Sequence, residues 1–331
     1  MIPYWSWTHQ PIPVGPLELH LFGILVGMGV LFGAWQARKH AEERGLKPIV
    51  IADLAIFVVI IAFIMAHQVS LFAYFPERVF GTPCPDGLCP LDATCGPRGR
   101  CDDGDWLEVV RIWNGISSFG GFLGAAIALA LFFRFERIVL IPKVLELTGG
   151  KGRPAMRYMD SLAFGFGLGW IFGRLGCFSA HDHVGKASES FLAVNFPDGW
   201  RSSVPAVSEF GAPGFTPRFD LGLLEVFWAV AIFALYWFYA RKRQDLRPGW
   251  YCAVMCISYA PYRFFLDTLR ATDIGGADTR YFQQLVEPGL TPGHVGAVIV
   301  LGIGLAFWFY GGKLARDPNY PKSDPVPAPE M

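Results

Sequence analysis

Charged residues are scarce in this sequence. Asp, Glu, Lys and Arg make up only 17% of its 331 residues, and the formal net charge at pH 7 is zero. Soluble domains carry roughly a quarter charged residues, so the composition excludes an ordinary soluble protein. The lack of net charge also removes any electrostatic case for nucleic acid as a partner. Hydrophobic residues make up 53% of the chain, and its mean hydropathy of +0.35 indicates a membrane protein.

Seven stretches are apolar over about the 20 residues that a helix needs to cross a bilayer. They lie at 19–35, 54–74, 117–133, 162–178, 221–239, 251–269 and 295–310. The predicted fold class is all-α: a polytopic membrane protein with seven transmembrane helices around a polar cavity. We expect one membrane domain over 1–312, with a Cys-rich outer loop at 81–105, a second outer loop at 179–220 and a disordered, proline-rich cytoplasmic tail at 313–331.

Basic residues are also missing from the start of the chain. No Lys or Arg precedes Arg38, whereas a cleavable signal peptide needs a positive first region, so the first span is expected to be retained. Of the 28 Lys and Arg residues, 17 fall on the side of the 36–53 loop, nine fall on the other side, and Arg174 and Arg263 lie within spans. The positive-inside rule therefore predicts an outer N-terminus and a cytoplasmic C-terminus.

Two further absences argue against other classes of seven-span protein. Transporters usually carry internal repeats, and none is visible here. A retinal protein needs a lysine in its last helix, and the span at 295–310 has none.

Four of the seven cysteines lie in one short Gly- and Pro-rich loop, at Cys84, Cys89, Cys95 and Cys101. On the oxidising side of the membrane this pattern favours two disulfides, whose pairing the sequence does not choose. A four-cysteine zinc site is the alternative.

Charged residues inside the predicted spans are the main functional signal, because they are costly at membrane depth. Tyr259, Arg263, Asp267 and Arg270 follow one another at steps of four, four and three, which places them on one helix face. A structural ion pair would explain the stripe. An anionic substrate would also explain it, and Arg174 would add a second planar donor group of the geometry that suits phosphate.

Several motifs resemble those of the prolipoprotein diacylglyceryl transferase family. The segment "GRLGCFSAHDHVG" (173–185) is similar to the family signature. The other matching segments are "LHLFG" (19–23), "NGISSFGG" (114–121), "TPRFDLGLLE" (216–225) and "YRFFLDTLR" (262–270). The resemblance implies a bacterial inner-membrane enzyme of lipoprotein biosynthesis, with no cofactor. Such an enzyme transfers the diacylglyceryl group of phosphatidylglycerol to the lipobox cysteine of a prolipoprotein signal peptide, and glycerol phosphate leaves.

The resemblance also implies roles for individual residues. By position, Arg174 and Arg263 match the arginines that handle the lipid phosphate, and Asp267 matches the acid beside the second of them. The remaining matches are Tyr259 and Arg270 at further functional positions, Asp182 at an acidic position and Gly185 at the closing glycine of the signature. Membrane lipids surround the protein, and a monomer is expected.

The chain departs from the family where the family usually has histidines. Phe119 and Phe219 occupy two such positions, and a phenylalanine cannot accept the proton of a substrate thiol. His181 and His183 are the predicted substitute bases, and Asp182 between them is a further candidate; the alternative is an exposed turn with incidental histidines. A metal site would need a third ligand beside these two, and the sequence does not support one. A catalytically inert relative that binds phosphatidylglycerol or lipoprotein precursors is therefore the second functional hypothesis.

Overall fold

The structure is a computed structural model that describes residues 1–15, 17–81, 104–112, 115, 117–200, 214–271, 273 and 289–324. Contacts divide the chain into two compact units, one made of Met1–Pro48 and Pro154–Met331, the other of Ile49–Arg153. The expectation of one membrane domain over 1–312 stays a prediction. The predicted disulfide cysteines, Cys84, Cys89, Cys95 and Cys101, lie outside the described residues.

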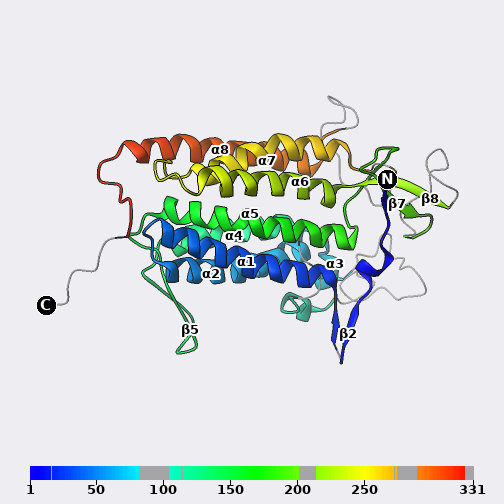
Figure 1. Ribbon diagram of the computed structural model, residues 1–331. Coiled ribbons are helices and arrows are strands. Elements are labelled where there is room, and N and C mark those ends of the chain that lie inside the picture. The colour runs from blue at the N-terminus through cyan, green and yellow to red at the C-terminus, as the bar shows by residue number, and fades with distance from the viewer. Residues whose placement is uncertain are drawn as a thin grey trace. The chain divides into compact units, whose positions relative to one another are not determined.

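Five helices form the larger unit (Figure 1): α1 (Leu21–Glu43), α5 (Ala155–Ala180), α6 (Leu221–Ala234, extended by a π-helical segment at Leu235–Ala240), α7 (Trp250–Thr268) and α8 (Pro292–Arg316). Helices α1 and α5 are antiparallel and pack closely through glycines. A Cβ atom on Gly29 would lie 2.8 Å from the carbonyl oxygen of Gly169, and one on Gly33 would lie 3.0 Å from that of Gly165. The glycine-rich run before the signature therefore lets two helices approach each other closely.

Short strands gather at the end of this unit where α5 ends and α6 begins (Figure 1). Four of them form one sheet in the order β1-β7-β8-β6, with β1 parallel to β7 and the other pairs antiparallel. Their bounds are β1 (Ile2–Pro3), β6 (Val184–Ala187), β7 (Val194–Pro197) and β8 (Phe215–Asp220), and a separate hairpin pairs β2 (Ile12–Val14) with β3 (Leu17–Leu19). Asp220 ends β8 and caps α6, because its side chain accepts a hydrogen bond from the backbone of Leu223 at 3.1 Å.

The opposite end of the same unit is closed by buried carboxylates. Asp160 accepts hydrogen bonds from the backbone of Gly249 at 2.6 Å and of Tyr251 at 3.0 Å. Asp324 is buried and accepts from the backbone of Lys47 at 3.0 Å. Helix α8 continues to Arg316, and the buried Asp324 packs against the segment just after the end of α1.

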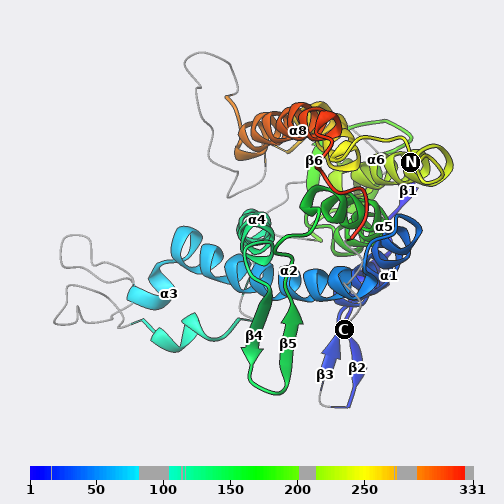
Figure 2. The same cartoon turned by 90° about the vertical axis from the view of Figure 1, so that its left-hand side faces the viewer.

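The second unit contains α2 (Pro48–Val69, extended by a π-helical segment at Ser70–Tyr74), α3 (Glu77–Phe80) and α4 (Ser118–Phe132). Its antiparallel hairpin joins β4 (Arg137–Ile141) to β5 (Leu145–Thr148) (Figure 2). Helix α4 packs on α2 through glycine, because a Cβ atom on Gly124 would lie 2.8 Å from the Cα atom of Ala62. Phe119, at one of the usual histidine positions, lies in α4.

The structure confirms a mostly helical protein with several apolar helices. Among the described residues, five helical segments are long and apolar enough to cross a membrane: Leu21–Glu43, Pro48–Tyr74, Ala155–Ala180, Leu221–Ala240 and Pro292–Arg316. The two other predicted spans also form helices. Helix α4 has only 15 residues, and α7 carries Arg263 and Asp267.

Candidate functional site

The last turns of α5 carry the first predicted site residue. Arg174 lies 4.6 Å from the centre of the Trp170 ring, one helical turn away. Its Nη1 atom lies 3.8 Å from the Cys177 sulfur, and its Nε atom lies 2.7 Å from a carboxylate oxygen of Glu225. The apolar ring and the carboxylate together hold the guanidinium inside the helical unit, where its side chain is 13% exposed.

Glu225 is the centre of the polar network, although no sequence motif predicted a role for it. Its carboxylate is fully buried in α6. It accepts from Arg263 Nη1 at 2.6 Å and from the Tyr259 hydroxyl at 3.0 Å, besides its ion pair with Arg174. One carboxylate therefore joins α5, α6 and α7. A signal for it existed, because Glu225 is the only charged residue between 221 and 240 in an apolar run.

Asp267 forms the second half of the network. Its Oδ1 atom lies 3.1 Å from Arg263 Nη2 and 3.4 Å from Arg270 Nε. Its other oxygen lies 3.7 Å from Nδ1 of His294 in the first turn of α8. A Cβ atom on Gly293 would lie 2.7 Å from this carboxylate, so the beginning of α8 fits closely against it, and a helix N-terminus favours an anion.

The structure connects all the residues of the predicted stripe and joins them to Arg174. Tyr259 and Arg263 share Glu225, while Arg263 and Arg270 share Asp267. Counted as ionised, the three arginines exceed the two carboxylates by one positive charge. Such a buried, net positive cluster of planar donors suits a phosphate group.

Gly185 is placed by contacts that require a glycine. It forms an isolated antiparallel bridge with Arg270, and the next residue, Lys186, donates its backbone N–H to the Leu269 carbonyl at 2.8 Å. A Cβ atom on Gly185 would lie 2.8 Å both from that carbonyl oxygen and from the Cβ atom of Phe219. Gly185 therefore brings strand β6 against the end of α7 beside Arg270, and Phe219 lies against the same strand.

The two histidines of the signature occupy different environments. His181 follows α5 in a left-handed conformation at φ 49° and is only 1% exposed. Its Nδ1 atom lies 2.7 Å from Asp220 Oδ2, and its ring contacts those of Tyr4, Phe178 and Phe196. Burial raises the pKa of Asp220, and the hydrogen bond to His181 opposes that rise. This environment favours a structural role for His181.

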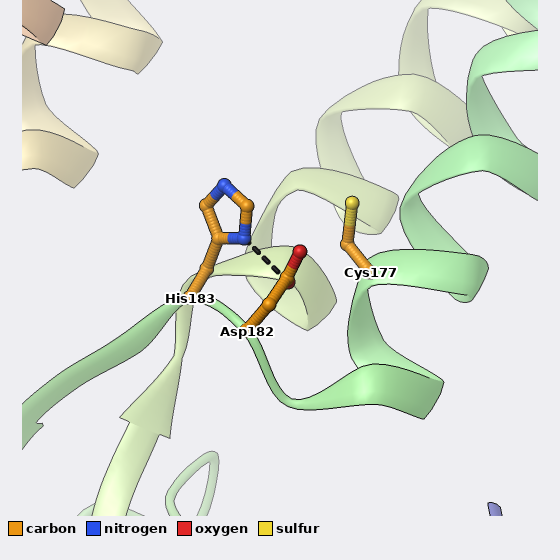
Figure 3. A group of neighbouring side chains, drawn as sticks. All are labelled: Cys177, Asp182 and His183. Atoms are coloured by element: carbon orange, nitrogen blue, oxygen red, sulfur yellow. Dashed lines mark hydrogen bonds and ion pairs between the residues drawn. The ribbon is translucent and has the colours of Figure 1, made fainter. Parts of the chain in front are cut away.

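Asp182 and His183 lie next to each other in the turn after α5 (Figure 3). Their side chains are 40% and 27% exposed, and His183 Nδ1 lies 2.5 Å from Asp182 Oδ1. Both lie beside Cys177 of the last turn of α5. Of the two predicted substitute bases, His183 is thus the accessible one.

A cavity of about 670 Å³ lies at the same end of the helical unit. The start of α1 and the end of α5 line it, together with the β2–β3 hairpin; the lining includes Glu18, His20, Phe22, Ile24 and Ala180. Most of these side chains are apolar, which suits a hydrophobic segment of a substrate better than its phosphate.

Comparisons with known proteins identify the family. The family model for prolipoprotein diacylglyceryl transferase matches residues 11–310. A phosphatidylglycerol–prolipoprotein diacylglyceryl transferase of Bacillus velezensis is 27% identical, over 79% of this chain and 80% of the relative. A protein of the same name from Gloeobacter violaceus is 25% identical, over 86% of this chain and 90% of the relative. Another from Janthinobacterium is 26% identical, over 93% of this chain and 100% of the relative. The chain therefore belongs to the prolipoprotein diacylglyceryl transferase family.

Proposed function

We propose that this protein transfers the diacylglyceryl group of phosphatidylglycerol to the lipobox cysteine of prolipoproteins. The observation that carries the proposal is the buried cluster in which Arg174 and Arg263 share Glu225. A lipid phosphate ester needs planar cationic donors, both to bind and to stabilise the phosphate as it leaves. Membership of the family supplies the reaction class.

In the proposed reaction the substrate thiolate attacks the carbon of the diacylglyceryl group that is bonded to the phosphate oxygen. The new carbon–sulfur bond forms as the carbon–oxygen bond breaks, and glycerol phosphate leaves with the electron pair. Arg174, Arg263 and Arg270 stabilise the negative charge of the phosphate, while Glu225 and Asp267 hold these arginines in place. Gly185 positions Arg270, and Tyr259 holds the Glu225 carboxylate.

The thiol proton needs an acceptor, and we assign it to the Asp182–His183 pair. Both side chains are partly exposed and hydrogen-bonded to each other. His181 is the weaker candidate, because its Nδ1 atom is occupied by Asp220 and its ring is enclosed. It holds the turn that carries the other two residues.

The proposed membrane arrangement has seven spans in the bacterial inner membrane. Helices α4 and α7 would complete the set, since α4 is apolar and the charged residues of α7 face protein partners in the described network. The distribution of Lys and Arg supports a periplasmic N-terminus and a cytoplasmic C-terminus. In the larger unit, α1 ends and α5 begins at the same end, as alternating spans require.

A second candidate function rests on the two phenylalanines. Phe119 and Phe219 stand where the family typically has histidine, so the chain could bind phosphatidylglycerol without transferring it. In that case the arginine cluster would still bind the lipid phosphate, and the reaction would stop at the bound lipid.

The deciding experiment uses purified full-length protein in phosphatidylglycerol micelles with a lipobox peptide. We expect thioether product together with an equal amount of released glycerol phosphate. Arg263→Ala should abolish both. Arg241→Ala is the matched control, because Arg241 pairs with Glu43 on the exposed surface and should leave both unchanged. Lipid binding without product in the wild type, and product from a Phe119→His, Phe219→His double variant, would identify an inert relative.

A further inference from the structure

Three residues near the end of α5 present the ligand atoms of a metal site (Figure 3). They are Cys177 in the last turn of the helix and Asp182 and His183 just after it. One atom from each, a sulfur, a carboxylate oxygen and an imidazole nitrogen, lies within 4.8 Å of the other two. The sequence predicted no metal site around the two histidines; the structure instead groups His183 with Asp182 and Cys177 and leaves His181 out.

The backbone explains why residues five and six positions after the cysteine return to it. His181 ends the helix in the left-handed conformation, which reverses the direction of the chain. The hydrogen bond to Asp220 and the surrounding aromatic rings hold that turn in place. Asp182 and His183 are therefore positioned by a buried anchor while their own side chains remain accessible.

The ligand types and their spacing suit zinc. Zinc binds cysteine sulfur at about 2.3 Å, histidine nitrogen at about 2.0–2.1 Å and carboxylate oxygen at about 2.0–2.2 Å. Two tetrahedral ligands at these distances are separated by roughly 3.3–3.7 Å. The nitrogen of His183 and the nearer oxygen of Asp182, 2.5 Å apart, would have to separate by about an ångström, and the sulfur, within 4.8 Å of both, would keep or shorten its distances. Side-chain rotation at these partly exposed residues permits such shifts.

The charges around the three residues also suit a divalent cation. A thiolate and a carboxylate would balance the two positive charges of the ion. The guanidinium of Arg174, 3.8 Å from the sulfur, would offset part of the cost of burying a thiolate there. Its repulsion of the ion is offset by its own ion pair with Glu225 at 2.7 Å.

We propose that Cys177, Asp182 and His183 form a Zn²⁺ site. Three protein ligands leave one tetrahedral position open to water or to a thiolate from outside. Binding would replace the hydrogen bond between Asp182 and His183 by bonds to the ion. One consequence rests on the proposed function. If His183 binds zinc through Nδ1, that atom cannot accept the thiol proton, so zinc should inhibit transfer.

The test measures metal binding directly. Full-length protein is stripped of metal under oxidising conditions, under which Cys84, Cys89, Cys95 and Cys101 are predicted to form disulfides. It is then equilibrated with Zn²⁺ against a competing chelator. We expect one zinc per chain. We also expect Co²⁺ in its place to give a thiolate-to-metal absorption band. Cys177→Ser, Asp182→Asn and His183→Gln should each weaken zinc binding by at least about 100-fold, the upper end of what loss of an outer-shell partner costs.

Matched controls separate the site from the rest of the chain. Cys256→Ser and His20→Gln change the same residue types elsewhere and should keep wild-type affinity. Zinc should also slow alkylation of Cys177 and leave Cys252 and Cys256 unaffected. The His183→Gln variant alters a partly exposed side chain, so its unfolding temperature should match that of the metal-free wild type and its weaker binding would report the ligand.

Two results would overturn the proposal. One is zinc retained with unchanged affinity in all three ligand variants, and the other is the absence of the Co²⁺ band in wild-type protein. Binding without inhibition of transfer would support the metal site while refuting His183 as the proton acceptor. Inhibition with no bound metal at this site would refute the metal site alone.

Discussion

Replacing Glu225 by Gln tests whether the buried carboxylate holds the site together. The substitution preserves the size of the side chain and removes its charge. In the native protein the carboxylate is fully buried and accepts from Arg174 at 2.7 Å, Arg263 at 2.6 Å and Tyr259 at 3.0 Å. A glutamine has one acceptor oxygen, and its amide donors would face the donors of the arginines. The two guanidinium groups, only 13% and 14% exposed, would lose their shared counter-charge.

The expected cost follows from this geometry. One hydrogen bond to a charged group contributes about 1.5–3 kcal/mol. Removing one partner of a buried ion pair costs about 3–5 kcal/mol, because a buried charge is left uncompensated. We therefore expect Glu225→Gln to lower the free energy of unfolding by about 3–5 kcal/mol and to abolish measurable transfer.

Chemical denaturation in mixed micelles measures this cost against a matched control. Glu43→Gln makes the same change in the Glu43–Arg241 pair, whose side chains are 31% and 22% exposed, and should cost about 0–1 kcal/mol. Adding Arg263→Met to Glu225→Gln should recover part of the loss, since one unpaired cation is removed. A Glu225→Gln protein no less stable than Glu43→Gln, or a double variant less stable than the sum of its parts, would refute the reasoning.

Three further outcomes are expected. Arg263→Ala removes one charge-assisted contact and should weaken phosphatidylglycerol binding by about 1.5–3 kcal/mol in lipid titrations. Arg263→Lys keeps the charge and should weaken binding less, and equal effects of the two variants would contradict a bidentate role. Gly185→Ala should destabilise the protein by about 1–3 kcal/mol in the same denaturation assay, because the added Cβ atom would lie 2.8 Å from the Leu269 carbonyl oxygen. A variant as stable as the wild type would contradict this close fit. The hydrogen bonds from buried Arg218 hold the pKa of Asp273 below its ordinary value, so the pair should stabilise the fold above about pH 4 and be lost as pH falls through the lowered value. Comparing Asp273→Asn with wild type across pH checks this, and a difference that persists in acid would contradict it.

Local patterns in the sequence predicted the family and most of the helices. The apolar runs became helices in the predicted places, and the comparisons confirm the family resemblance. The spacing of Arg263 and Asp267 on one helix predicted a contact that the structure contains at 3.1 Å. Such contacts lie within one turn of one helix, so the period of the helix is enough to predict them.

Glu225 could not be placed by the same reasoning, because its partners lie on other helices. Arg263 follows it by 38 positions, and Arg174 precedes it on α5. A period along one helix does not say which faces of two helices meet. A lone charge in an apolar helix is costly, however, so it must have a partner. A carboxylate without a partner in one span and an excess of arginines in another span therefore together predict that the two spans are in contact.

The histidines of the signature show a second limit of sequence patterns. Residue type alone makes His181 and His183 equal candidates for a base, since both have the same ring and lie two positions apart. Packing distinguishes them, because a left-handed turn at φ 49° directs His181 into aromatic rings and onto Asp220, 39 residues later in the chain. A positive φ is uncommon for a residue with a Cβ atom, so no simple pattern marks a histidine there. The turn that buries one histidine is also what leaves the other exposed beside Cys177, and the chemistry at this end of α5 therefore depends on the residue that takes no direct part in it.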